Sequence, residues 1–276
     1  MANPSILELD SLQIQVLIDN ELDPISPSPN PSITQSGGMQ TIAFRGPTPP
    51  DRMGAAKEIR MDNICCSAHG LSLLITGTKD GVSHTVLFDT GPEAHAWERN
   101  ATRLGVADSQ IAGVERIVLS HWHRDHSGGM VKAVEMIAKA RARAGREGER
   151  VEVDVHPARP VFRGMRPPEL PIVSLEPDPT FEEIEGAGGK VRKSGEAHAI
   201  CDDYFLVSGE IPRVTEYERG LRFGMRVDDR EEGWKPDEQM ADERFLMCNV
   251  KGTPFPPPVK SMYTLTVSPP AHQTKA

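Results

Sequence analysis

Cysteine is scarce in this chain of 276 residues, which has four, at positions 65, 66, 201 and 248. Thiols so few and so scattered exclude a disulfide scaffold or a zinc ribbon built on Cys-x-x-Cys pairs. The sequence also lacks an apolar run near the roughly 20 residues that a membrane span requires, and no basic, secretory-type segment opens it. We therefore expect a soluble, cytoplasmic protein with no membrane partner.

Positive charge is also in deficit, because 31 Lys and Arg face 40 Asp and Glu and give a formal net charge of −9. Nucleic-acid phosphates repel an acidic chain, so we expect no nucleic-acid partner. The 24 glycines and 24 prolines are many for a compact enzyme. They predict long loops around a packed core.

Strand-like segments followed by helix-like segments predict an α/β layered fold. The turn signal Asp80-Gly81 predicts a hairpin between two of the strands. Ser127 is the predicted N-cap of the helix after the last buried strand, and Gly128-Gly129 would let the backbone approach a neighbour closely. Residues 162–189 are expected to be a Pro- and Glu-rich connection. The predicted strands are 12–18, 71–76, 84–89, 114–120, 151–155, 204–207 and 221–227, and the predicted helices are 93–104 and 127–144.

The segment SHWHRDHSGG, residues 120–129, concentrates metal-binding side chains: His121, His123, Asp125 and His126. It lies between a buried strand and a helix, and such loops commonly carry function on a rigid scaffold. Residues i and i+2 of an extended segment point the same way, so His121 and His123 can bind one metal ion. Asp125 and His126 can reach a second ion. Imidazole and carboxylate without thiolate favour one or two zinc ions and tolerate iron or manganese.

SHWHRDHSGG resembles the HxHxDH signature of the metallo-β-lactamase superfamily, and FDTG at residues 88–91 resembles that superfamily's first motif. The resemblance implies an αββα sandwich and a metal-dependent hydrolase. It also implies that Asp89 orients a ligand histidine and the water at the metal, and that Asp125 holds a second metal and orients the nucleophile. These two aspartates are the predicted catalytic residues. On its own, Asp89 could equally be a turn aspartate.

Further segments narrow the resemblance, over residues 12–252, to the branch named after a dihydropterin–ribofuranosylaminobenzene-phosphate synthase. These segments are VLIDN at 16–20, HGLS at 69–72 and SGEIPR at 208–213. In that branch a segment like 237–252 leads into an apolar strand and a loop that supplies another ligand histidine. Here a proline-rich stretch follows instead, so the resemblance implies an incomplete C-terminal half. His272 is the one histidine of that tail.

The expected organisation of the chain has four parts. Residues 1–22 form a first strand region, and residues 23–62 form a Pro-, Ser- and Gly-rich surface loop or a disordered insertion. A meandering but ordered loop is the alternative for 23–62. Residues 63–252 form the metallo-β-lactamase-like domain, and residues 253–276 form a divergent, Pro-rich tail.

Three other histidines and one arginine are candidates to complete the site. His198, His156 and His69 could each be an extra ligand or line the pocket, and the alternative for each is a surface or supporting position. Arg213 in SGEIPR could hold a substrate anion such as phosphate or carboxylate. The alternative for this Arg213–Glu210 segment is an Arg–Glu pair that fixes a loop.

The predicted function is hydrolysis of a small ester, lactone or phosphoester substrate by a metal-activated water. The leading alternative is a non-catalytic, truncated remnant that still binds metal, which the proline-rich end favours. A third possibility is an oxygen-handling diiron protein, which uses related ligands but whose separate flavin module has no counterpart in this sequence.

Overall fold

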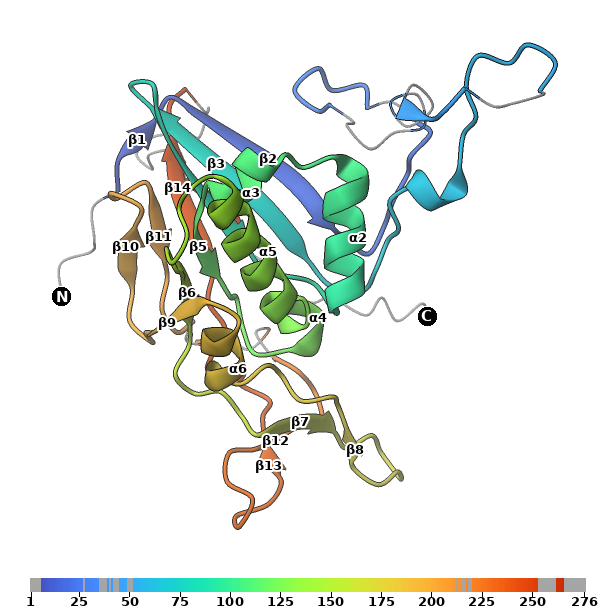
Figure 1. Cartoon of the computed structure of the whole chain (residues 1–276). Helices are drawn as coiled ribbons and strands as arrows, with labels where there is room; N and C mark the ends of the chain where they lie inside the picture. Colours follow the sequence, from blue (N-terminus) through green and yellow to red (C-terminus); the bar gives the residue numbers. More distant parts are fainter. Residues whose placement is uncertain are drawn as a thin grey trace.

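The computed structural model of the protein describes residues 6–26, 28–34, 39, 41, 45–48, 52–211, 213–214, 217, 220–252 and 262–265. These residues form sheets of six, five and four strands, with the longer helices against the six-stranded sheet (Figure 1). Within this part of the chain, no helix combines the length and apolarity that crossing a membrane needs.

The six-stranded sheet carries the histidine cluster, and its strand order is β2-β3-β4-β5-β6-β9. Antiparallel pairing joins β2, β3 and β4, and parallel pairing joins the rest. The predicted β3–β4 hairpin is confirmed: it turns at Asp80 and Gly81, whose φ values of 49° and 77° suit a two-residue turn. The strands are β2 (Ser11–Ile18), β3 (Ser72–Lys79), β4 (Val82–Phe88), β5 (Val114–Val118), β6 (Val151–Val155) and β9 (Gly189–Lys193).

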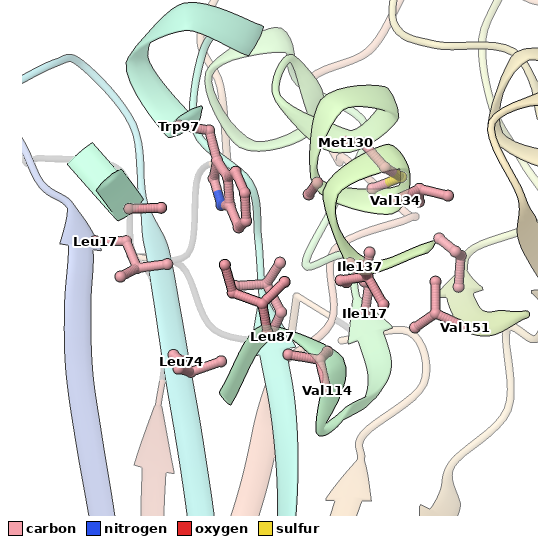
Figure 2. Close-up of a cluster of buried hydrophobic side chains, with 14 of the residues drawn as sticks. Leu17, Leu74, Leu87, Trp97, Val114, Ile117, Met130, Val134, Ile137 and Val151 are labelled. Carbon is pink, nitrogen blue, oxygen red and sulfur yellow. The ribbon is translucent and has the colours of Figure 1, made fainter. Parts of the chain in front are cut away.

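Helices cover one face of this sheet and enclose the larger hydrophobic core (Figure 2). Leu74, Leu87 and Ile117 point from neighbouring strands into that core. They cluster there with Trp97 of one helix and Ile137 of another. The helices of the described residues include α2 (Ala94–Leu104), α3 (Asp108–Ala112), α4 (Arg124–Ser127), α5 (Met130–Arg143) and α6 (Phe181–Gly186).

The opposite face of the six-stranded sheet packs against the five-stranded sheet. Leu73, Val86 and Val118 alternate with the residues of the first core and cluster with Phe205 and Leu246. Successive side chains of a strand point to opposite faces, so each strand serves both cores. This stacking confirms the predicted α/β sandwich. The second sheet contains β1 (Glu8–Leu9), β10 (His198–Ile200), β11 (Phe205–Val207), β14 (Leu246–Val250) and β15 (Met262–Leu265).

A four-stranded antiparallel sheet lies beyond one end of the two larger sheets (Figure 1). It contains β7 (Phe162–Met165), β8 (Val173–Ser174), β12 (Gly224–Val227) and β13 (Lys235–Pro236). Residues 162–189, expected to be a Pro- and Glu-rich connection with no strand or helix named in it, contain β7, β8 and α6, so that expectation is incomplete. The overlooked signal for α6 was the T-x-x-E capping box of Thr180 and Glu183.

The helix after the histidine cluster begins later than predicted. The short α4 ends at Ser127, two glycines follow, and α5 begins at Met130 with Gly129 as its N-cap. Ser127 is therefore not the N-cap of the long helix. Its hydroxyl donates instead to the Asp178 carboxylate, because the fold brings that buried acid to the same point.

The long segment between β2 and β3 extends beside the sandwich (Figure 1). Within its described part, Met61–Asn63 forms the 3-10 helix η1, and Arg45 donates to the Leu104 carbonyl of α2. In the region expected to be a divergent tail, β15 pairs with β14. The remainder of that tail, including His272, lies outside the described residues. The four-part division of the chain stays a prediction.

Replacing Leu87 by Ala should lower the free energy of unfolding by about 2–5 kcal/mol, because the cavity lies inside the larger core and cannot be filled. Leu87 has no exposed surface. The matched control is Val82→Ala on the same strand, whose side chain is 56% exposed and should cost less than about 1 kcal/mol. Urea unfolding followed by circular dichroism measures both, and equal losses would contradict the assignment of β4 to this core.

Candidate metal centre

The histidine cluster lies where neighbouring parallel strands end. Phe88 of β4 pairs with Val118 of β5, and Val118 pairs with Asp154 of β6. The chain therefore leaves these three strands at adjacent points of one sheet edge. Asp89 follows the first of them, and residues 120–126 follow the second.

Two glycines let the cluster pack against the turn after β4. A Cβ atom at Gly128 would lie 1.7 Å from the carbonyl oxygen of Pro92, and one at Gly129 would lie 2.2 Å from that of Thr90. The close backbone approach predicted for these glycines is confirmed. The backbone N–H and the hydroxyl of Thr90 donate to the His126 carbonyl at 2.8 and 2.9 Å, which fixes the cluster to the turn.

Asp89 is the buried anchor of the cluster. It has no exposed surface, and its φ of 56° lies in the left-handed region, which aspartate enters more readily than most residues. Its Oδ1 accepts from the Ser120 backbone N–H at 2.7 Å. Its Oδ2 accepts from the Ser120 hydroxyl at 2.8 Å and interacts with Nδ1 of His126 at 2.7 Å. This geometry fits the orienting role that the resemblance implied.

The same bonds determine which nitrogen of His121 carries its proton. Ser120 gives its only hydroxyl proton to Asp89, so it must accept a hydrogen bond from Nδ1 of His121, 2.9 Å away. Nε2 of His121 therefore keeps its lone pair. That lone pair faces Nδ1 of His123 at 2.8 Å.

The first two histidines of the cluster are electrically neutral. Burial lowers the pKa of His121 well below its ordinary value, and the neighbouring His126 and His123 lower it further. Burial and the charge of Arg163 lower the pKa of His123 to about 4, against the opposing charges of nearby carboxylates. Neutral imidazole is the form that binds a metal ion. His121 offers the lone pair of Nε2 directly, whereas Nδ1 of His123 donates to it here and would have to pass its proton to Nε2 of the same ring before binding a metal.

His126 differs, because carboxylates surround it. Burial would lower its pKa, but the charge of Asp89 and the hydrogen bond to it, with the charge of Asp125, outweigh burial and raise this pKa. Its Nδ1 faces Asp89, so Nε2 is the nitrogen left to a metal ion. A metal ion must compete with a proton for that nitrogen, so binding there weakens as the pH falls.

The candidate donors lie as two neighbouring pairs, His121 with His123 and Asp125 with His126. The described residues contain no set of three or more His, Cys, Asp or Glu side chains arranged to hold a metal ion. The facing nitrogens of His121 and His123 nevertheless suit zinc in chemistry and position. Two imidazole nitrogens on tetrahedral zinc are about 3.3 Å apart, and these two are 2.8 Å apart. A small opening of the pair would admit the ion, so the residues fit the metal.

A family model described as the metallo-β-lactamase superfamily matches residues 69–214, more than half of the chain, and this range includes the whole histidine cluster. This chain belongs to the metallo-β-lactamase superfamily. The family predicted from the HxHxDH motif is thereby confirmed, and so is its αββα sandwich fold.

Individual members of known function or structure share less than 30% of their aligned residues with this chain. The chain is 29% identical over 124 residues to the 7,8-dihydropterin-6-methyl-4-(β-D-ribofuranosyl)-aminobenzene-5'-phosphate synthase of Methanocaldococcus jannaschii, covering 45% of this chain and 38% of that protein. A solved metal-dependent hydrolase of the β-lactamase superfamily is 15% identical with a TM-score of 0.49, covering 87% of this chain and 62% of that one. For the metallo-β-lactamase MIM-1 of Novosphingobium pentaromativorans these values are 16%, 0.33, 71% and 55%. The chain thus spans less than two thirds of each of these relatives.

Asp125, in the second half of the segment HWHRDH, lies against His69. Oδ2 of Asp125 lies 3.3 Å from Nε2 of His69 and 3.5 Å from Nε2 of His126. The chain can come this close because the next residue is Gly70, where a Cβ atom would lie 2.0 Å from the Asp125 carbonyl oxygen. Of the three extra histidines named from sequence, His69 is the one that the structure places against Asp125.

The other two histidines have different surroundings. His198 directs Nε2 to Asp154 at 2.7 Å and Nδ1 to a backbone carbonyl at 2.8 Å, so both of its ring nitrogens are engaged. His156 is 3% exposed, and its Nδ1 accepts from the Ala158 N–H at 3.2 Å. Its Nε2 lies 3.3 Å from Glu210 but has no hydrogen-bond partner among the described residues. A buried nitrogen of this kind keeps His156 a candidate pocket residue.

Arg213 is already paired. Its Nη2 lies 2.7 Å from Oε2 of Glu243, and its Nε donates to the Gln239 carbonyl at 3.0 Å. The alternative of an Arg–Glu pair that fixes a loop therefore fits, although the glutamate is Glu243 rather than Glu210. A substrate anion would have to compete with Glu243 for this guanidinium.

Sequence reasoning missed the buried ionic groups behind the cluster. Asp154 has no exposed surface and accepts from Nη1 of Arg244 at 2.9 Å. Arg244 also donates to the Leu119 carbonyl at 2.7 Å, at the end of β5. The overlooked signal was a carboxylate within the apolar strand VEVDV, since a buried charge requires a partner.

Gly128→Ala should lower the free energy of unfolding by about 1–3 kcal/mol or more, because the added methyl group meets a backbone oxygen that cannot turn away. The matched control is Gly186→Ala at the end of α6, where a Cβ atom would have no neighbour within 4 Å. That change should be neutral or stabilising by up to about 1 kcal/mol. Thermal unfolding of both variants measures the difference, and a harmless Gly128→Ala would contradict the close approach.

Asp154→Asn should change how stability depends on pH. Burial raises the pKa of Asp154, but the hydrogen bond from His198 and the charge of Arg244 outweigh it and hold this pKa below its ordinary value. A lowered folded-state pKa stabilises the protein above the unfolded pKa, near ~3.9, and this contribution is lost as pH falls through the folded pKa.

At pH 6 the Asp154→Asn variant should be less stable than the wild type by about 3–5 kcal/mol, since Arg244 is left buried and unpaired. The gap should narrow toward pH 3. Urea unfolding over this pH range measures it, with the exposed Asp19→Asn as the control. A gap independent of pH would show that Asp154 is not ionised in the folded protein.

Proposed function

We propose that this chain is a metal-dependent hydrolase with zinc as its resident metal, acting on a small ester, lactone or phosphoester substrate. One observation carries the proposal: the neutral imidazoles of His121 and His123 face each other at a sheet edge, beside Asp125 and His126. Neutral nitrogen donors next to a carboxylate are the ligand set of zinc in hydrolytic sites.

Each residue of the cluster has a separate task in this proposal. His121 and His123 hold the first zinc ion, and Asp125 and His126 hold a second. Zinc supplies a water of lowered pKa and polarises the bond to be broken. Asp125 would orient the attacking water, and Asp89, by accepting at Nδ1 of His126, leaves Nε2 of that ring as the nitrogen that would bind the metal.

His69 is proposed as the third donor to the second zinc ion, beside Asp125 and His126. Its Nε2 already lies within 3.3 Å of the Asp125 carboxylate, and 72% of its side chain is exposed, so it can move toward an ion at little cost. Iron or manganese could occupy the same oxygen and nitrogen donors. Metal analysis of the purified protein therefore counts all three elements.

A second candidate function is metal binding without turnover. The observation that favours it is the arrangement in pairs, since catalytic zinc commonly has three protein ligands and an open position and no such set of three occurs among the described residues. This alternative predicts bound zinc and no hydrolysis of any substrate class. The first proposal predicts bound zinc and hydrolysis.

His121→Ala and His123→Ala should each abolish zinc-dependent hydrolysis and remove the zinc ion assigned to this pair, because each deletes one of its two facing donors. Purified protein is stripped with dipicolinate and reloaded with zinc. Zinc per chain is then measured by mass spectrometry, and turnover is followed on bis(4-nitrophenyl) phosphate, a γ-lactone and a thioester. The control is His95→Ala, an exposed histidine of α2. Unchanged turnover in His121→Ala would overturn the proposal.

A further inference from the structure

The peptide groups on both sides of Trp122 are held by two charged side chains. The Trp122 N–H donates to Oδ2 of Asp242 at 2.7 Å. The Trp122 carbonyl accepts from Nη1 of Arg163. Arg163 also pairs with Asp242 itself through both terminal nitrogens, one of them at 3.1 Å. The two side chains and the Trp122 backbone therefore form one closed set of hydrogen bonds.

These bonds act on the two peptides that join the facing histidines. The N–H belongs to the peptide between His121 and Trp122, and the carbonyl belongs to the peptide between Trp122 and His123. Each peptide plane is thus fixed by one charge-assisted hydrogen bond, which is about twice as strong as a neutral one. Rotation of either plane would swing a histidine Cα–Cβ bond away from its partner.

The Trp122 side chain adds a third point of attachment. It has no exposed surface, and its indole N–H donates to the His156 carbonyl at 2.8 Å. Its ring meets Phe181 edge-on, with ring centroids 5.7 Å apart. The Trp122 side chain is therefore held by burial, by one hydrogen bond and by one ring contact, in addition to the two bonds of its backbone.

The partners come from all three sheets. Trp122 follows β5 of the six-stranded sheet, Arg163 lies on β7 of the four-stranded sheet, and Asp242 lies in the segment that leads into β14 of the five-stranded sheet. Arg244 of the same segment donates its backbone N–H to the Ser120 carbonyl at 2.8 Å. The histidine loop is therefore set by how the three sheets dock.

Burial makes this pair unusual for charged residues. Arg163 is 4% exposed and Asp242 has no exposed surface. Burial alone would raise the pKa of Asp242, but the Arg163 charge and the hydrogen bonds from Arg163 and from Trp122 outweigh it and lower this pKa. Taking such charges out of water offsets most of their mutual attraction, so a gain in net stability does not explain the pair.

We propose that Asp242 and Arg163 are positioning residues of the metal centre, which lock the Trp122 peptides so that His121 and His123 converge on one ion. This inference rests on the proposed function. Neither side chain is proposed as a ligand; both would act through the Trp122 backbone, by holding the ligand pair in its metal-binding geometry before the ion arrives.

Asp237 provides the matched control. Its Oδ2 accepts from Nε of Arg163 at 2.7 Å, and it is 7% exposed. Asp237 belongs to the same buried ionic group, but it contacts the Nε side of the Arg163 guanidinium. Of the two aspartates, only Asp242 accepts from the Trp122 N–H. Asp237→Asn therefore weakens the Arg163 ion pair and leaves the Trp122 peptide held.

The test compares full-length wild type, Asp242→Asn and Asp237→Asn, each shown to be folded by circular dichroism. Zinc affinity is measured by competition with a chromophoric chelator. Asp242→Asn should weaken zinc binding by about 10–100-fold, the usual loss when a partner behind the ligands is removed, and Asp237→Asn should change it less than about 3-fold. Amide hydrogen exchange of the metal-free proteins should show Trp122 protected in the wild type and in Asp237→Asn, and exposed in Asp242→Asn.

Equal affinity in wild type and Asp242→Asn, or equal losses in both variants, would overturn the positioning role. A wild type that takes up no zinc, with His121→Ala indistinguishable from it, would instead overturn the proposed function.

Should Asp242→Asn fail to fold, Arg163→Lys takes its place. Lysine keeps the charge opposite Asp242 but lacks the planar fork that reaches the Trp122 carbonyl at the same time, so zinc affinity should again fall. An unchanged affinity would contradict the proposal.

Discussion

The candidate metal centre depends on one buried carboxylate, that of Asp89. It accepts from the backbone and the hydroxyl of Ser120 and interacts directly with His126, so one side chain orients both ends of the histidine loop. Its left-handed backbone, with φ of 56°, places the carboxylate under the loop at the end of β4. The strain is tolerated because the Asp89 N–H donates to the Val118 carbonyl of β5 and the Asp89 carbonyl accepts from the Ser72 hydroxyl of β3, which holds the backbone on either side.

A second set of buried charges binds the backbone of the same loop. Asp154 with Arg244, and Asp242 with Arg163, lie behind the loop and bind its backbone at Leu119 and Trp122. Ion pairs of this kind add little net stability, because the cost of desolvation is close to the gain in attraction. What they provide is geometry: charged groups with fixed hydrogen-bond directions define where the loop runs more narrowly than apolar packing does.

Sequence patterns predicted the sandwich well where the chain is regular. The β3–β4 hairpin follows from Asp80-Gly81 between apolar runs, and α2 was expected within one residue of its observed start at Ala94. The patterns failed where elements are short or polar, as in β7, where Arg163 and Gly164 interrupt the apolar alternation. They also failed at Ser127, whose hydroxyl is used by Asp178 rather than by the helix.

The sequence by itself determined the donor types of the candidate metal centre and their local spacing, because His121, His123, Asp125 and His126 lie within six positions of a strand-to-helix loop. Only the tertiary structure decided which partners hold those donors. His126 and Asp89 are 37 positions apart, and Trp122 and Asp242 are 120 apart. No local periodicity links residues so distant, since their contact depends on how whole sheets pack, and that packing is set by the apolar cores rather than by the site.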